Sequence, residues 1–349
     1  MDKNSSTIDD RFSYFDFLRV AGAFAIMVIH MSSETVLTKD VFSLEWEIMN
    51  FYKCVTRWAV PIFVMISGAL FLNREIPLRK IYGKYIFRIL TAFFFWSFIY
   101  ATASYVAKRD AVKAVELFIK GQYHMWFLLM IMGLYALHPF LKKIAESETL
   151  TKYFLALSFV TASLVPETVR IISLFSEEYG TFADSFTKCF YLDFAAGFTG
   201  YFLLGYCLNN ASITKKTERL IYILGIIGFA ATILMSLYAS RFKGEPFDFY
   251  EENMNMSVNV LCEAVAVFVF FKKKLNFPVK IIRVLSQYSF GAYLVHVAVI
   301  SELIRLFGRG TPAFNPMFSI PLSAMIVFVI SFAISAALNH VPVLKKYIV

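Results

Sequence analysis

Long apolar stretches separated by short polar segments run along nearly the whole of this chain of 349 residues. A helix needs about 20 mostly apolar residues to cross the hydrocarbon core of a bilayer. Ten stretches meet that requirement: residues 14–32, 55–73, 81–107, 123–141, 151–171, 188–208, 219–240, 255–272, 286–307 and 316–340. The longest polar gaps, 33–54 and 172–187, are expected to be loops. The pattern therefore predicts an all-α integral membrane protein, built as a single polytopic bundle of about ten transmembrane helices.

The composition agrees with this class. Hydrophobic residues make up 58% of the chain, aromatic residues 18%, and 39 residues are phenylalanine. A soluble fold of this length could not bury so much apolar surface. We expect one transmembrane domain over 13–340, with short tails at 1–12 and 341–349. The first stretch is too long and too charged for a signal-peptide core, so we expect it to be retained.

The basic residues are unevenly distributed among the polar segments. If ten helices alternate in direction, the segments on the side of the N-terminus collect most of the lysines and arginines. By the positive-inside rule, both tails are cytoplasmic and the protein is a multi-pass protein of the cell membrane (the inner or plasma membrane), surrounded by membrane lipids. The net charge of +9 is then mainly a topology signal, and we expect no nucleic-acid partner.

Few ionisable side chains fall inside the predicted helices: Asp16, Arg19, His30, Arg57, Arg88, Asp193, Glu263, His296, Glu302 and Arg305. Charge inside a membrane is costly unless it faces protein or water, so these residues are candidates for function or for buried pairing. We expect Asp193 and Glu263 to pair with a partner such as Arg57 or a backbone donor. Glu302 and Arg305, three residues apart, are expected to form a salt bridge along one helix.

The sequence contains no pattern typical of a metal site or of a disulfide framework. The four cysteines, Cys54, Cys189, Cys207 and Cys262, show neither paired nor metal-like spacing. No EF-hand, P-loop or zinc signature is present. We therefore predict free thiols and no metal site.

Arg19 and His30 stand out because they lie eleven residues apart in the first stretch. At about 100° and 1.5 Å per residue, this spacing places both on nearly the same helix face, roughly 16 Å apart along the axis. Arg19 is expected in the inner part of the membrane and His30 near the outer surface. Imidazole suits a general base because its ordinary pKa lies near neutral pH. A histidine at a helix end can also be a simple interfacial residue.

Further motifs accompany this pair. They are Pro61-x-Phe63 and Ser67-Gly68-x-x-Phe71, Trp126-Phe127-Leu128 with Pro139, and the run Ser289-Phe290-Gly291-Ala292-Tyr293-Leu294-Val295-His296. Together they resemble the acyltransferase-3 family of membrane-integral acyltransferases over about residues 12–340, with no fused hydrolase or racemase domain. The resemblance implies an enzyme that transfers an acyl group, usually acetyl from acetyl-CoA on the cytoplasmic side, to a hydroxyl of a surface or secreted glycan.

The implied donor, acetyl-CoA, carries phosphates that planar guanidinium groups bind well. We expect Arg19 and Arg88, with Arg79 and Lys84, to hold it at the inner mouth of the bundle. Arg88 matches the second of two family arginines three residues apart, whereas Tyr85 stands where the first would be. Arg79 and Lys84 taken singly can also be ordinary positive-inside charge.

On the acceptor side, the resemblance assigns catalysis to His30, with Arg19 assisting. Whether His30 deprotonates the acceptor directly or is first acylated stays open. We expect His124 at the outer surface, together with Trp126 and Arg57, to contact a glycan or lipid-linked saccharide acceptor. Trp126 can equally belong to the interfacial aromatic belt, and His138 is expected to be an interfacial anchor.

Two rival functions come from other classes. A secondary transporter or exporter of a small molecule or saccharide fits the composition equally well, although carriers often show inverted repeats and broken helices that are not evident here. A membrane-embedded sensor or assembly partner for glycan export would need neither Arg19 nor His30. Acceptor identity, acyl-chain length and oligomeric state do not follow from the sequence.

Overall fold

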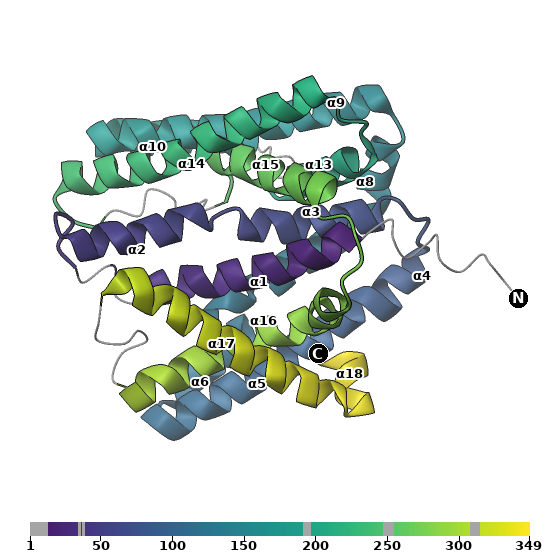
Figure 1. The fold of residues 1–349 in the computed structure, drawn as a ribbon, viewed down its shortest axis with the longest axis vertical. Coiled ribbons are helices and arrows are strands. Elements are labelled where there is room, and N and C mark those ends of the chain that lie inside the picture. Colours follow the sequence, from purple (N-terminus) through teal and green to yellow (C-terminus); the bar gives the residue numbers. More distant parts are fainter. Residues whose placement is uncertain (1–12, 34–35, 37–38, 191–196, 247–254, 308–314) are drawn as a thin grey trace, which may run out of the picture.

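A computed structural model describes residues 13–33, 36, 39–190, 197–246, 255–307 and 315–349. Within these residues every regular element is a helix and no strand occurs, so the predicted all-α class is confirmed. Most of the long helices run roughly side by side across the molecule (Figure 1). All four cysteines are free thiols, as predicted.

Helices account for almost all of the described residues. In chain order they are α1 (Ser13–Ser33), α2 (Leu44–Val55), α3 (Ala59–Phe71), α4 (Leu78–Lys80), η3 (Ile81–Ile86), α5 (Phe87–Lys108), α6 (Ala111–Lys120), η4 (Tyr123–Met125), α7 (Trp126–Ala136), α8 (His138–Ala145), α9 (Glu148–Ser158), η5 (Phe159–Leu164), α10 (Val165–Phe175), α11 (Glu177–Lys188), α13 (Thr199–Asn210), α14 (Lys215–Lys243), α15 (Val258–Lys274), α16 (Lys280–Phe307), α17 (Pro316–Asn339) and α18 (Pro342–Tyr347).

Eight segments of the described chain are long and apolar enough to cross a membrane. They are Ser13–Ser33, Leu44–Phe71, Leu78–Lys108, Ala111–Ala136, Glu148–Phe175, Lys215–Lys243, Lys280–Leu306 and Pro316–Asn339. The shorter helices α13 and α15 overlap the two other predicted spans, 188–208 and 255–272, and pack against α3 and α14 respectively. The protein is therefore a multi-pass membrane protein.

The second span begins earlier than predicted, because the expected loop 33–54 contains α2. Ser43 caps this helix by accepting a hydrogen bond from the backbone N–H of Trp46. Trp46 is buried. Glu47 pairs with Arg241 of α14. Acidic residues favour a helix N-terminus but lower the local hydropathy, which explains why the sequence pattern missed this half of the span.

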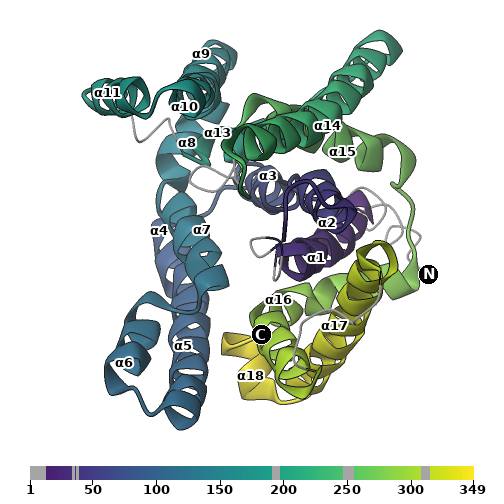
Figure 2. The same ribbon diagram turned by 90° about the vertical axis from the view of Figure 1, so that its left-hand side faces the viewer.

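The other expected loop, 172–187, is also helical. α10 ends at Phe175, and Ser176 caps α11 by accepting from the backbone N–H of Tyr179. The two helices pack closely: a Cβ added to Gly180 would lie 1.9 Å from the Ser173 hydroxyl. Figure 2 shows α11 beside α10 at the periphery of the bundle. Polar and acidic residues on α11 lower its hydropathy, which is why the sequence pattern predicted a loop here.

The fourth span is broken near its middle. α6 forms its first part, α7 its second, and the chain between them passes through Gly121, Gln122 and η4. Lys113 and Lys120 both pair with Glu116. Because these charged residues lower the hydropathy of α6, the sequence pattern did not include α6 in the predicted span. His124 therefore lies within the candidate span Ala111–Ala136 and not at the start of a span, as the sequence pattern had predicted. Broken helices, which were not evident from the sequence, are thus present.

Gly121 makes this break possible, and its substitution should be destabilising. Its φ of +76° lies in the left-handed region, and an added Cβ would lie 2.8 Å from the Phe93 ring. Gly121→Ala is expected to lower the free energy of unfolding by about 1–2 kcal/mol. Thermal unfolding in detergent micelles measures this effect. Gly133→Ala, in the same span with nothing within 4 Å of the added Cβ, is the control, and an equal effect of both substitutions would refute the explanation.

α1 lies at the centre of the bundle. It packs against α16, α17, α3, α2 and α15, and Figure 2 shows it between the group of α16 and α17 and the group of α14 and α15. Phe15, Leu18 and Met27 of α1 are almost completely buried. Side chains on α1 are therefore surrounded mainly by protein. This environment is less costly than lipid for the ionisable side chains of this helix.

α3 and α13 approach each other backbone to backbone. A Cβ added to Gly68 would lie 1.7 Å from the Phe202 carbonyl oxygen, and one added to Gly205 would lie 2.0 Å from that of Met65. Small residues allow such approaches between helices in membranes. The glycine of the Ser67-Gly68 motif thus has a packing role, with α13 as the partner.

Candidate functional site

Arg19 and His30 of α1 both face α16. Arg19 lies with its Nη1 atom 3.5 Å from the Asp16 carboxylate and 3.5 Å from the Ser286 hydroxyl. Ser286 in turn donates to Asp16 at 2.6 Å. Farther along, the ring of His30 lies 5.1 Å from that of His296, centroid to centroid. The residues follow the same order on both helices, so α1 and α16 run parallel and the shared face expected for Arg19 and His30 is present.

His30 belongs to a cluster of three histidines that come from three different elements. His30 is on α1, His124 is in η4 at the break of the fourth span, and His296 is on α16. The ring centroids of His124 and His296 are 5.0 Å apart. Sequence reasoning did not connect His296 with His30. Its position in the Ser289–His296 motif was the only available signal, because the two residues lie far apart in the chain.

Two of the three histidines in this cluster are buried away from solvent. His124 is 3% exposed and His296 0%, whereas His30 is half-buried. His296 bonds through Nδ1 to the Tyr293 carbonyl at 2.5 Å. Within the described chain, neither ring nitrogen of His124 nor Nε2 of His296 has a hydrogen-bond partner. Unsatisfied buried polar atoms are rare in proteins and are typical of functional sites.

Tyrosine side chains hold the cluster in place. Tyr100 of α5 donates to the Leu294 carbonyl at 2.8 Å, and Tyr293 of α16 donates to the His124 carbonyl. The rings of Tyr100 and Tyr293 lie 5.6 and 5.5 Å from that of His124, and the Tyr123 ring lies 5.4 Å from that of His30. These contacts tie the broken span to both neighbouring helices. Irregular backbone at membrane depth requires such enclosure by protein.

A second polar group joins Arg19 to Arg88. Both guanidinium groups interact electrostatically with the hydroxyl of Tyr135 on α7. Tyr135 also stacks on Phe71, with ring centroids 3.9 Å apart. Tyr85, which stands in place of an arginine, packs against the same Phe71 ring at 4.8 Å. No local signal in the sequence could have linked Tyr135 to two arginines.

Arg88 is exposed and lies near the last residues of the chain. It donates to the Val349 carbonyl at 2.6 Å, and its guanidinium lies 5.6 Å from the centroid of the Phe290 ring on α16. Lys84 and Arg79 are also exposed, on η3 and α4. Lys84 lies over the Tyr85 ring at 5.8 Å. These cations thus belong to one short stretch at the start of the third span.

The remaining candidates lie in other surroundings. Trp126 is 37% exposed, with its ring 5.7 Å from that of Phe198. Arg57 is buried at the turn between α2 and α3 and interacts electrostatically with Glu263 of α15. The hydroxyl of Thr232 donates to the Glu263 carboxylate.

Three further expectations can be compared with the structure. The Glu302–Arg305 salt bridge is formed, at 2.7 Å. Asp193 lies outside the described residues. His138, just beyond the end of the candidate span Ala111–Ala136, is buried against protein, with Nε2 3.1 Å from the Phe71 carbonyl.

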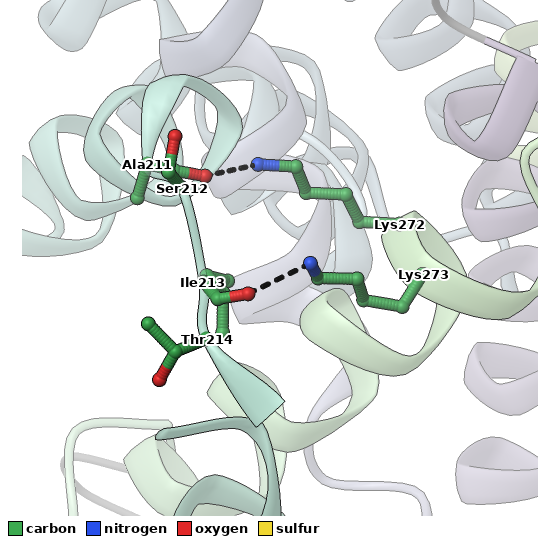
Figure 3. Close-up of a pocket in the computed structure, with 6 residues that line it drawn as sticks. All are labelled: Ala211, Ser212, Ile213, Thr214, Lys272 and Lys273. Atoms are coloured by element: carbon green, nitrogen blue, oxygen red, sulfur yellow. Dashed lines mark hydrogen bonds between the residues drawn. The ribbon is translucent and has the colours of Figure 1, made fainter. Parts of the chain in front are cut away.

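Two surface hollows lie apart from these residues. The first, of about 440 Å³, is lined by residues 211–214 with Lys272 and Lys273 (Figure 3). There Lys272 donates to the carbonyls of Leu208, Asn209 and Ala211 at the end of α13, and Lys273 donates to that of Ile213. The second, of about 420 Å³, lies around Phe140 and Lys143. Because both lysines of the first hollow donate to backbone carbonyl groups, we assign this hollow a structural role.

No group of histidine, cysteine and acidic side chains in the described part of the chain has the arrangement of a metal site. Imidazole rings such as those of the three-histidine cluster are suited to proton transfer and hydrogen bonding. A half-buried imidazole with two buried imidazoles behind it can take a proton from a hydroxyl group. The arginine pair around Tyr135 is suited to an anionic group.

Comparison with known proteins identifies the family. The acyltransferase-3 family model, described as an acyltransferase domain, matches residues 12–340. No curated protein and no solved structure matches the chain. The matched range runs from α1 through α17 and contains the histidine cluster and both arginines. The chain therefore belongs to the acyltransferase-3 family and is a membrane-embedded acyltransferase.

Proposed function

We propose that the protein transfers an acetyl group from cytoplasmic acetyl-CoA to a hydroxyl of a cell-surface or lipid-linked glycan. The observation that carries this proposal is the shared face of α1. It presents Arg19 beside Ser286 and His30 beside His296, so a cation and an imidazole lie at two levels along the same pair of helices. A long donor with phosphates at one end and a thioester at the other suits that arrangement.

The donor's phosphates would bind at the level of Arg19. Arg88, Lys84 and Arg79 are exposed on the adjoining stretch from α4 to α5 and would extend this cationic mouth. Guanidinium groups bind phosphate oxygens through charge-assisted hydrogen bonds. The bias of lysine and arginine toward one set of polar segments supports a cytoplasmic location for this mouth and for both tails.

The reaction would take place at His30. The acceptor oxygen attacks the thioester carbonyl carbon while its proton passes to a nitrogen of His30. The carbon–sulfur bond then breaks, the ester forms, and the coenzyme A thiolate leaves with the proton that His30 returns. His30 is half-buried, so the acceptor can reach it, and the acceptor would lie near His124 and Trp126. No metal takes part in this proposal.

The broken fourth span also supports a site inside the bundle. Irregular backbone within a membrane persists where it is enclosed by protein or lines a polar cavity. The break positions His124 next to His296. A carrier can also contain broken helices, so transport of a small molecule or saccharide is the rival reading that experiment must exclude.

Mass spectrometry of surface glycans tests the proposal. Glycans from cells that contain the protein should carry acetyl groups that are missing when the protein is absent or when His30 is replaced by alanine. Identical glycan masses in all three cases would refute it. Accumulation of a saccharide in vesicles without any acyl donor would favour transport.

Removal of either arginine should weaken donor binding. A charge-assisted hydrogen bond to phosphate contributes about 1.5–3 kcal/mol, so Arg19→Ala and Arg88→Ala should each raise the KM for acetyl-CoA about 10-fold to 100-fold. Initial rates in membrane vesicles at varied concentrations of labelled acetyl-CoA measure this. Lys216→Ala, at an exposed cation on α14 outside this mouth, is the control and should leave the KM unchanged. An unchanged KM in both Arg19→Ala and Arg88→Ala would reject the donor site.

A further inference from the structure

His296 is a buried titratable residue that the proposed reaction does not yet use. Its Nδ1 atom lies 2.5 Å from the Tyr293 carbonyl oxygen. Because a carbonyl can only accept, Nδ1 carries the proton, and the neutral ring presents Nε2 as an acceptor. Nε2 has no partner in the described part of the chain, and the side chain is 0% exposed. Leaving such an acceptor unpaired is costly, so its placement requires an explanation.

Two imidazoles lie close enough to supply the missing donor, and their orientations differ. The His30 ring is tilted by 37° to that of His296, with centroids 5.1 Å apart. The His124 ring is inclined at 80°, with centroids 5.0 Å apart. The His124 ring is buried and also contacts the rings of Tyr100 and Tyr293, whereas the His30 ring is partly exposed. His30 is therefore the ring with more freedom to turn one of its nitrogens toward Nε2 of His296.

We propose that His296 is the positioning residue for His30. Its Nε2 atom accepts the N–H of His30, which fixes the tautomer of His30 so that the opposite nitrogen keeps its lone pair for the acceptor hydroxyl. This inference rests on the proposed acyl transfer. Catalytic hydrogen bonds are often long in the absence of substrate and tighten when it binds, which agrees with the present ring separation.

The contact matters most during the reaction. When His30 takes the proton from the acceptor hydroxyl, its N–H···N bond to His296 becomes charge-assisted and therefore stronger. The interaction thus stabilises the transition state more than the ground state and raises kcat. The proton then leaves with the coenzyme A thiolate, and His296 gains and loses no proton over the cycle.

Two substitutions separate this role from a structural one. His296→Gln places an amide at the position of Nε2, where its oxygen can accept from His30. His296→Asn places an amide at the position of Nδ1, which keeps the bond to the Tyr293 carbonyl but leaves nothing at Nε2. If His296 positions His30, the glutamine variant should retain activity and the asparagine variant should lose it. A purely structural role for the Tyr293 bond predicts the opposite order.

Transfer of label from radioactive acetyl-CoA to the glycan and lipid fraction of membrane vesicles provides the measurement. We expect kcat to fall about 10-fold to 100-fold in His296→Asn, with the KM for acetyl-CoA changed less than twofold, and to stay within about fivefold in His296→Gln. His138→Gln is the matched control, since His138 is also buried but bonds Phe71, and it should keep the wild-type rate. Asparagine as active as glutamine overturns the inference.

A double variant gives an independent check. His296 acts only through His30, so His30→Ala combined with His296→Asn should be no slower than His30→Ala alone. Additive losses would overturn the positioning role. Failure of the proposed function can be told apart from failure of this inference. No transfer by the wild type, or full transfer by His30→Ala, rejects the proposed function. A normal wild type and inactive His30→Ala with a fully active His296→Asn reject only the inference.

Discussion

Replacing His30 with alanine is expected to abolish acyl transfer while the amount of protein in the membrane stays unchanged. The substitution removes the proposed base, and general acid–base catalysis contributes about 10²-fold to 10⁴-fold to rates. The side chain is half-buried, and its described contacts are ring contacts with Tyr123 and His296. Loss of those contacts should leave the packing of α1 intact. Transfer of label from acetyl-CoA in vesicles, normalised to the protein level, measures the effect.

Two further variants define what His30 supplies. His30→Gln keeps hydrogen-bonding atoms but cannot take a proton at neutral pH, so it should be nearly as inactive as the alanine variant. His340→Ala, at an exposed histidine beyond the end of α17, should behave as the wild type. Substantial transfer by His30→Ala would show that another group deprotonates the acceptor.

The largest expected effect on folding belongs to Gly68. A Cβ at this position would lie 1.7 Å from the Phe202 carbonyl oxygen, 2.5 Å from its carbonyl carbon and 2.8 Å from its Cα. These are backbone atoms within a helix, so they cannot move aside as a flexible side chain could. Gly68→Ala should therefore force α3 and α13 apart and lower the free energy of unfolding by at least about 3 kcal/mol.

Size-exclusion chromatography and thermal unfolding in detergent measure this prediction. Gly68→Ala and Gly205→Ala should both give little folded protein, because each glycine faces backbone of the opposite helix. Gly83→Ala, whose added Cβ has nothing within 4 Å, serves as the control and should fold normally. A stable, monodisperse Gly68→Ala protein would show that α3 and α13 do not pack in this way.

The consequences of the α3–α13 contact extend to the site. Phe71, on the last turn of α3, stacks on Tyr135, which interacts with both Arg19 and Arg88. Its carbonyl oxygen also lies 3.1 Å from Nε2 of His138, at the start of α8. Displacement of α3 would therefore disturb the surroundings of the two arginines as well as the bundle itself.

The sequence by itself determined the class of the protein and much of its order. Transfer of apolar side chains into lipid depends on contiguous residues, so hydropathy identified a polytopic helical bundle with most of its spans. Helical periodicity is equally local, and it placed Arg19 and His30 on one face of α1, where they contact Ser286 and His296 of α16. The motifs were sufficient to indicate the family.

Only the tertiary structure decided which residues complete the site. The charged residues Lys113, Glu116 and Lys120 lowered the hydropathy of α6, so only the structure joins α6 to α7 in one span with His124 between them. His296 and Tyr135 come to His30 and Arg19 from α16 and α7, far away in the chain. Such encounters depend on how helices pack against each other, and no local pattern of residues encodes that packing.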